Sequence, residues 1–103
     1  MCLFCKIAAK QIPAKIAFED DDLLAFHDIN PGAPTHLLVI PRKHLSSLDE
    51  ASADDQALLG KLLLACQRVA REQGLVQSGF RVVANTGPNA GQSVFHLHLH
   101  VLG

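Results

Sequence analysis

His96-Leu97-His98-Leu99-His100-Val101-Leu102, close to the end of the chain, alternates imidazole and aliphatic side chains. The alternation predicts a β-strand with its three histidines on one face, because successive side chains of a strand point to opposite faces. Neighbouring histidines would then stand about 6.6 Å apart and the outer two about 13 Å apart. A regular strand therefore cannot bring all three to one metal ion. We expect its aliphatic face to pack and its histidine face to support chemistry.

The composition describes one small, nearly neutral domain. The 103 residues predict a single domain, 1–103, whose surface an oligomer would help to cover. Ten acidic and nine basic residues give no charge excess that favours nucleic acid or a membrane surface as partner. The longest apolar stretches, such as 62–66, are far shorter than a membrane span, and the N-terminal residues lack the basic and apolar layout expected of a signal peptide. Three cysteines do not form a disulfide framework, so we expect a soluble, cytoplasmic protein.

The first half of the chain predicts a short helix and three strands. An amphipathic turn or two covers residues 2–10 and ends before Pro13. Two short strands, 14–19 and 23–28, flank an acidic tripeptide that suits a hairpin. A turn rich in Asn, Pro and Gly follows, and then a strand at 36–40 that Pro41 closes.

The second half predicts one long helix and two further strands. Ser52 and Asp55 have the spacing of a capping box, and Gly74 supplies a stop. The apolar residues between them follow a helical period: Leu58, Leu59, Leu62, Cys66, Val69 and Ala70. Strands at 80–85 and 94–102 complete an α+β fold with a mainly antiparallel five-stranded sheet, one long helix and one short helix.

The loop 86–93 leads into the histidine strand and is rich in glycine. Its backbone N–H groups suit an anion, Ser93 adds a hydroxyl, and the imidazoles can attack phosphorus or move protons. This combination favours phosphoryl or nucleotidyl transfer over a strand whose polar face is histidine by chance. Cys2 and Cys5 form a C-x-x-C pair that fits a redox pair, half of a zinc site or coincidence.

Five segments, residues 12–16, 18–21, 25–29, 33–44 and 91–103, carry a resemblance to one known family. Through them the chain resembles the histidine triad (HIT) proteins, in their bacterial histidine triad nucleotide-binding branch, over nearly its whole length. The resemblance implies the HIT fold and a homodimer. It also implies a phosphoramidase that cleaves purine nucleoside 5′-phosphoramidates of the AMP-amine type through a nucleotidyl-histidine intermediate, without a catalytic cofactor.

The resemblance assigns the catalytic roles residue by residue. It implies that His98 is the nucleophile, with its second ring nitrogen donating to a backbone carbonyl near the first histidine of the triad. His100 would contact the atoms around the α-phosphorus, and His36 would complete the cluster and help to move protons. Ser93 would hydrogen-bond the phosphate or the leaving group.

The resemblance also implies the nucleotide contacts. Asp28 would accept the ribose hydroxyls and Asn85 would lie near the phosphate, although by position alone both read as turn formers. The loop residues Gly91, Gln92 and Ser93 would meet the phosphate through backbone N–H groups. The base would lie between apolar side chains, namely Phe4, Ile7, Phe26 and Ile29. His27 matches no role and is predicted to be a surface residue.

A structural zinc site is the last implication of the resemblance. Its ligands would be Cys2, Cys5, His44 and His96, a Cys₂His₂ set of the type that binds zinc tetrahedrally. The alternative is a pair of free thiols near a frayed terminus.

The best-known members of the branch continue beyond the position of Gly103 with a tail over the partner's site, so we expect a different or looser choice of leaving group here.

Three other functions stay open at this point. A sister branch of the family hydrolyses dinucleoside polyphosphates. A nucleotide-binding interaction protein with incidental hydrolysis would need the same pocket, and a metal-storage protein would use the same histidines.

Overall fold

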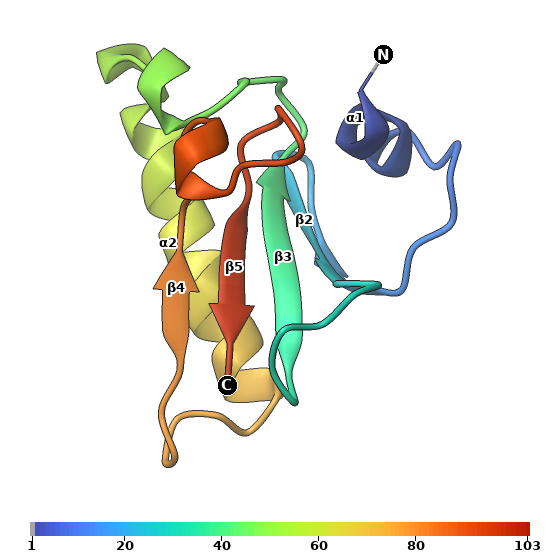
Figure 1. Ribbon diagram of the computed structural model, residues 1–103, viewed down its shortest axis with the longest axis vertical. Coiled ribbons are helices and arrows are strands. Elements are labelled where there is room, and N and C mark those ends of the chain that lie inside the picture. The colour runs from blue at the N-terminus through green and yellow to red at the C-terminus, as the bar shows by residue number, and fades with distance from the viewer. Residues whose placement is uncertain (1) are drawn as a thin grey trace.

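The computed structural model describes residues 2–103 and has an α+β architecture, as predicted. One antiparallel sheet contains β1 (Ile16–Glu19), β2 (Leu23–His27), β3 (His36–Pro41), β4 (Arg81–Val83) and β5 (Leu99–Leu102) in the order β1-β2-β3-β5-β4. The short helix α1 (Leu3–Ala8) and the long helix α2 (Gln56–Glu72) lie on opposite sides of the strands (Figure 1). None of the helices in this part of the chain is both long and apolar enough to cross a membrane.

The helix α2 begins where the sequence predicts. Ser52 accepts a hydrogen bond from the Asp54 N–H at 3.2 Å, and the Asp55 carboxylate accepts one from the Ser52 N–H at 3.0 Å. The predicted capping box is therefore present, and it opens a 3-10 turn at Ala53–Asp55 that runs into α2. Capping satisfies backbone donors that the first helical turn leaves without partners.

The sheet buries a different cluster on each face. Towards α2, alternate strand residues such as Val39 and Val101 pack with Leu62, Cys66 and Val69, which confirms the predicted apolar face of the helix. Towards α1, the intervening strand residues pack with the helix in a second cluster: Phe4, Ile7, Leu24, Phe26, Leu38 and Ile40. The α2 face therefore forms the main core, and the α1 face is left to build a site.

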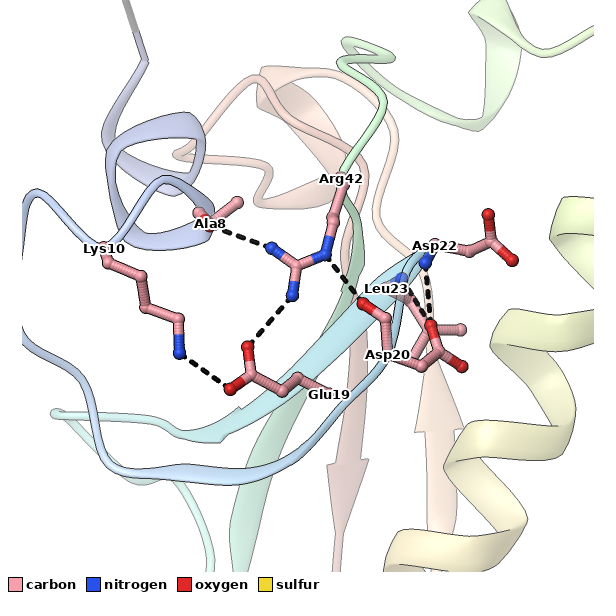
Figure 2. Close-up of polar contacts among 7 residues, drawn as sticks. All are labelled: Ala8, Lys10, Glu19, Asp20, Asp22, Leu23 and Arg42. Atoms are coloured by element: carbon pink, nitrogen blue, oxygen red, sulfur yellow. Dashed lines mark hydrogen bonds and ion pairs between the residues drawn. The ribbon is translucent and has the colours of Figure 1, made fainter.

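A polar network ties the end of α1 to the sheet, and Figure 2 shows its residues. Arg42 donates from Nη1 to the Ala8 carbonyl at 2.9 Å, from Nε to the Asp20 carbonyl at 2.8 Å and from Nη2 to the Glu19 carboxylate at 2.9 Å. Lys10 donates to the same carboxylate at 2.7 Å. One guanidinium thus links the end of α1 to the end of β1 and to the first residue of the turn that follows it.

The histidine segment departs from the prediction of a strand over 94–102. Pairing of β3 with β5 runs from His36↔Leu102 to Val39↔Leu99 and stops there. Further along β3, Pro41 has no N–H for the ladder, and the Leu97 N–H donates instead to the Leu45 carbonyl at 2.6 Å. The expectation of three histidines on one regular strand is therefore wrong, because only His100 lies in β5.

Two other strands are shorter than predicted. The segment 80–85 forms a strand only at Arg81–Val83, at the edge of the sheet. The segment 14–19 becomes a strand only from Ile16, and its pairing with β2 is irregular between Ile16 and Phe18.

Candidate functional site

A cavity of about 1100 Å³ opens on the α1 side of the sheet. Its polar side includes His36 at the start of β3, His98 just before β5 and His100 within β5. Its apolar side includes Phe4 and Ile7 of α1. The volume is slightly above the roughly 300–1,000 Å³ of small-molecule sites, and a few polar groups converge on apolar walls, as in most ligand pockets.

In His98, only the Nδ1 atom has a hydrogen-bond partner within residues 2–103, and Nε2 is left for the cavity that this residue lines. Its Nδ1 lies 2.7 Å from the His96 carbonyl oxygen, and because a carbonyl can only accept, Nδ1 carries the proton. The neutral ring therefore keeps a lone pair on Nε2, in the arrangement that the resemblance implies. The edge of the Phe4 ring packs against the imidazole with 5.1 Å between centroids and a 90° interplanar angle. The ring is 7% exposed, so its orientation is fixed by packing as well as by the carbonyl.

His36 and His100 form a second imidazole pair beside it. Because Leu38 pairs with His100 across the β3–β5 ladder, His36 is a diagonal neighbour of His100 on the same face. His36 Nε2 lies 2.9 Å from His100 Nδ1 and 3.4 Å from Asp28 Oδ2. Burial lowers the pKa of His100 and the two nearby imidazoles lower it further, against an opposing effect of Asp28, so its neutral form is favoured.

The loop before the histidines is organised by Gln92, which is buried. Its side chain accepts from the Gly87 N–H at 2.8 Å and donates to the Ser46 and Val94 carbonyls at 2.7 and 3.1 Å. The Gln92 backbone N–H donates to the Gly87 carbonyl at 3.0 Å. Gln92 therefore shapes the loop from inside, and its backbone N–H is already engaged there.

The residues predicted to contact phosphate differ in whether they line the cavity. Ser93 is exposed and lines the cavity. Within residues 2–103, the cavity lining does not include Asn85, Gly91 or Gln92. Gly91 has a φ of 88°, a left-handed conformation that glycine adopts without strain, where it caps the turn Pro88–Ala90.

The apolar end of the cavity lies between α1 and β2. Phe4, Ile7 and Phe26 line it and are buried, and Phe4 meets Phe26 edge to face at 5.5 Å between centroids. Asp28 stands where this end meets the histidines, and Ile29 lies at the rim with 91% of its surface exposed.

Sequence reasoning missed part of this wall. His27 is half-buried and lines the cavity, so its assignment to the surface is wrong. Burial and the charge of Lys15 lower the pKa of His27. Lys15 lines the cavity too, because its carbonyl accepts from the His27 N–H at 3.0 Å next to the β1–β2 pairing. No local signal identifies these residues, because the wall exists only once residues 12–15 fold along β2.

A second cluster of side chains lies at the N-terminal end of α1. The Sγ atoms of Cys2 and Cys5 lie 3.3 and 3.4 Å from His96 Nδ1, and His44 Nδ1 lies 3.1 Å from His96 Nδ1. His96 is fully buried and donates from Nε2 to the Pro41 carbonyl at 2.8 Å, which leaves a lone pair on Nδ1 facing the sulfurs. Tetrahedral zinc bonds of about 2.3 Å to sulfur and about 2.0–2.1 Å to nitrogen separate ligand atoms by roughly 3.3–3.8 Å. The donor set and its spacing therefore fit one such ion.

The two clusters share a residue and a helix. His96 turns its ring to the sulfur cluster and its carbonyl to His98. Cys2 and Cys5 lie at the start of α1, and the same helix supplies Leu3, Phe4 and Ile7 to the cavity wall. A ligand held by the sulfur cluster would therefore fix the backbone that orients His98.

Comparisons with known proteins agree with this geometry. A sequence model of the family described as "HIT domain" matches residues 9–103. Protein HitA of Neisseria gonorrhoeae is 51% identical over 102 residues, which cover 99% of this chain and 94% of that protein. The structure of a HIT family hydrolase from Legionella pneumophila Philadelphia 1 superposes with a TM-score of 0.98 at 48% identity and covers 100% of this chain and 92% of its own. A histidine triad nucleotide-binding protein from Candida albicans superposes with a TM-score of 0.89 at 31% identity, over 98% of this chain and 73% of its own.

Proposed function

We propose, on the premise that the chain belongs to the HIT domain family, that it hydrolyses purine nucleoside 5′-phosphoramidates of the AMP-amine type. The observation that carries the proposal is the state of His98, whose Nδ1–H is engaged by the His96 carbonyl and whose Nε2 is left bare at the cavity. A neutral imidazole with a free lone pair is the form that attacks phosphorus. The relatives named as hydrolases and as a nucleotide-binding protein support the same reaction class.

The reaction takes two displacements at phosphorus. The His98 Nε2 lone pair forms a bond to the α-phosphorus, and the bond from phosphorus to the amine breaks with its electron pair passing to the amine nitrogen. That nitrogen takes up a proton from solvent and leaves as the free amine. Water then attacks the nucleotidyl-histidine and loses a proton, and the electron pair of the phosphorus–histidine bond returns to Nε2. The sum is phosphoramidate plus water giving nucleoside monophosphate plus amine.

The surrounding groups divide the substrate between them. His100 and Ser93 line the cavity beside His98 and would hydrogen-bond the phosphate oxygens. His36 supports His100 through their 2.9 Å contact. Asp28 keeps carboxylate oxygens at the cavity for ribose hydroxyls, and the base would pack on the ring of Phe4 and its apolar neighbours.

A single-turnover assay with ³²P-labelled adenosine 5′-phosphoramidate tests this function. Acid-labile label on histidine should appear in the parent protein and decay to AMP. His98→Ala should bind AMP but fail to release amine, because no lone pair then faces phosphorus. Parent-rate turnover by His98→Ala would rule out the assigned nucleophile.

The substrate panel separates the rival functions. The same assay is run with diadenosine polyphosphates, and the phosphoramidate should have the higher kcat/KM. A higher kcat/KM for the dinucleotides would replace the proposal with the sister activity. AMP binding without turnover of either substrate would indicate an interaction protein.

We propose in addition that Cys2, Cys5, His44 and His96 hold one structural zinc ion. When bound, the ion supplies a cross-link between α1 and the segment that carries His96, and no chemical step is routed through it. Protein purified without added zinc should contain about one equivalent of the metal. Less than about one tenth of an equivalent would contradict the proposal. Cys5→Ser should abolish retention, whereas the matched variant Cys66→Ser, in the core under α2, should keep the metal.

The protein is further proposed to form a homodimer. Strand β4 lies at the edge of the sheet and, in the described part of the chain, pairs only with β5; Val82 within it is 39% exposed. On α2, Leu63 and Leu64 are 58% and 65% exposed. An open edge strand and exposed leucines favour burial against a second copy, because a two-fold interface covers both copies at once. Sedimentation should give the dimer mass at micromolar concentration and a lower mass for Val82→Lys, and a parent monomer would contradict it.

A further inference from the structure

The loop between β2 and β3 folds back over the ring of His36. The Gly32 backbone N–H donates to His36 Nδ1 at 2.8 Å. The loop is closed on itself, because the Asp28 N–H donates to the His36 carbonyl at 2.9 Å and the Asn30 N–H donates to Asp28 Oδ1 at 2.9 Å. Thr35 and Gly103 exchange backbone hydrogen bonds of 2.9 and 3.0 Å at its end. These bonds fix the Gly32 amide relative to the imidazole that it contacts.

A backbone amide can only donate, and this decides the tautomer of the neutral His36 ring. The nitrogen that accepts from Gly32 carries no proton, so the neutral ring of His36 holds its proton on Nε2. That nitrogen faces two acceptors, His100 Nδ1 at 2.9 Å and Asp28 Oδ2 at 3.4 Å. His100 Nδ1 therefore accepts from His36, and the proton of the neutral His100 ring is on Nε2.

We propose that the Gly32 amide is a positioning group that sets the tautomers of His36 and His100, so that His100 offers an Nε2–H donor to a phosphate oxygen in the cavity. The proposal rests on the proposed function in one respect, the phosphate. Within residues 2–103, His100 Nε2 has no hydrogen-bond partner. Every fully buried side-chain nitrogen or oxygen in the same residues has a partner, so an unpartnered nitrogen cannot be one of the buried atoms. His100 Nε2 is therefore accessible at the cavity that the ring lines.

The consequence is a matched pair of rings at the phosphate position. The His98 and His100 centroids are 5.0 Å apart. His98 offers a lone pair because a carbonyl holds its proton, whereas His100 offers a proton because an amide acts on it through His36. A nucleophile and a hydrogen-bond donor side by side suit the attacked phosphorus and its developing charge.

The same amide bears on metal binding. Asp28, His36 and His100 place ligand atoms within 4.8 Å of one another, a spacing that could hold a cation. A metal on His36 Nε2 would move the ring proton to Nδ1, where it would face the Gly32 N–H. The amide therefore disfavours metal at this group, and metal titration should saturate at the sulfur cluster alone.

The tautomers can be read directly from the metal-loaded parent protein. Long-range ¹H–¹⁵N spectra of protein labelled in histidine distinguish protonated from bare ring nitrogens, and His36→Asn and His100→Asn assign the signals by their loss. We expect bare Nδ1 and protonated Nε2 in both rings. A protonated Nδ1 in either His36 or His100 would overturn the proposal.

Two substitutions at Gly32 isolate the amide. Gly32→Ala keeps the N–H, and its Cβ would lie 3.7 Å from His36 Nδ1, an ordinary contact at a φ outside the left-handed region. This variant should keep the parent tautomers. Gly32→Pro removes the donor, so His36 should become a mixture of tautomers, with kcat lower by about tenfold or more and KM changed less. An unchanged His36 spectrum in folded Gly32→Pro would refute the role of the amide, and the parent spectrum decides the question if that variant does not fold.

Ligand addition separates this proposal from the proposed function. The His100 Nε2–H signal should move when AMP is added and not when adenosine is added, because only AMP carries phosphate. An equal response to adenosine would refute the phosphate contact. If the tautomers and the AMP response are as expected but no phosphoramidate is cleaved, the positioning stands and the proposed function fails.

Discussion

Truncation of Phe4 to alanine tests whether α1 is an integral wall of the cavity. Phe4 is 5% exposed and packs edge to face on Phe26 and on His98, with centroids 5.5 and 5.1 Å apart. Truncating a buried phenylalanine costs about 3–5 kcal/mol of the free energy of unfolding. We expect about 3 kcal/mol, the lower end of the range, because the ring also borders the open cavity. For a domain of this size that lowers the Tm by about 12 °C.

The assay is thermal unfolding followed by circular dichroism, with calorimetric titration of AMP beside it. Leu3→Ala is the matched control, because Leu3 lies next to Phe4 in the same helix and is 48% exposed. It should lower the Tm by less than about 4 °C. Loss of the aromatic contact should also weaken AMP binding by roughly 2–10-fold in Phe4→Ala. Equal Tm shifts for the two variants would refute the packing argument, since a helix that does not cover the sheet gains nothing from Phe4.

Three further outcomes follow from the rest of the molecule. Burial raises the pKa of the Cys66 thiol to about 12, so a thiol reagent at neutral pH should leave Cys66 unmodified in native protein and label it after unfolding, and rapid native labelling of Cys66 on mass spectrometry would contradict this. Hydrogen bonds from Lys43 and from the Ser52 N–H hold the pKa of Asp55 below its ordinary value of 3.8, so its contribution to stability is present above that pH and is lost as the pH falls through the lowered value. In acid titrations, the stability of Asp55→Asn should therefore fall less steeply than that of the parent, and parallel curves would count against this role of Asp55. Arg42→Met removes three hydrogen bonds and should lower the free energy of unfolding in urea by about 1–3 kcal/mol, whereas Lys10→Met removes one exposed contact and should lower it by less than about 1 kcal/mol. The reverse order would show that the guanidinium does not anchor α1.

Elements whose signals are local could be predicted from the sequence. The period of Leu62, Cys66 and Val69 predicts the buried face of α2, and Ser52 with Asp55 predicts its start, because both patterns act within a few residues. The start of β5 could not be predicted. It depends on Pro41 and on the Leu45 carbonyl, which come from more than fifty residues earlier.

The candidate site divides along the same line. The alternation around His98 predicted a reactive histidine cluster, and the resemblance implied that His36 belongs to it, where the structure places His36 against His100. The hydrogen bonds that the backbone N–H groups of Gln92 and Gly32 donate could not be predicted from the sequence, because a hydrogen bond from a backbone N–H does not depend on residue type. His27 was missed for a related reason, since its place in the wall depends on residues 12–15 lying along β2.

The division of the sheet into two independent faces has an evolutionary consequence. The residues that pack under α2 take no part in lining the cavity, whereas the six-residue helix α1 supplies Leu3, Phe4 and Ile7 to it. Substitutions at a few positions of α1 can therefore change which ligand is bound while the larger core keeps the chain folded. The histidines and the main core under α2 are under separate selection from these positions.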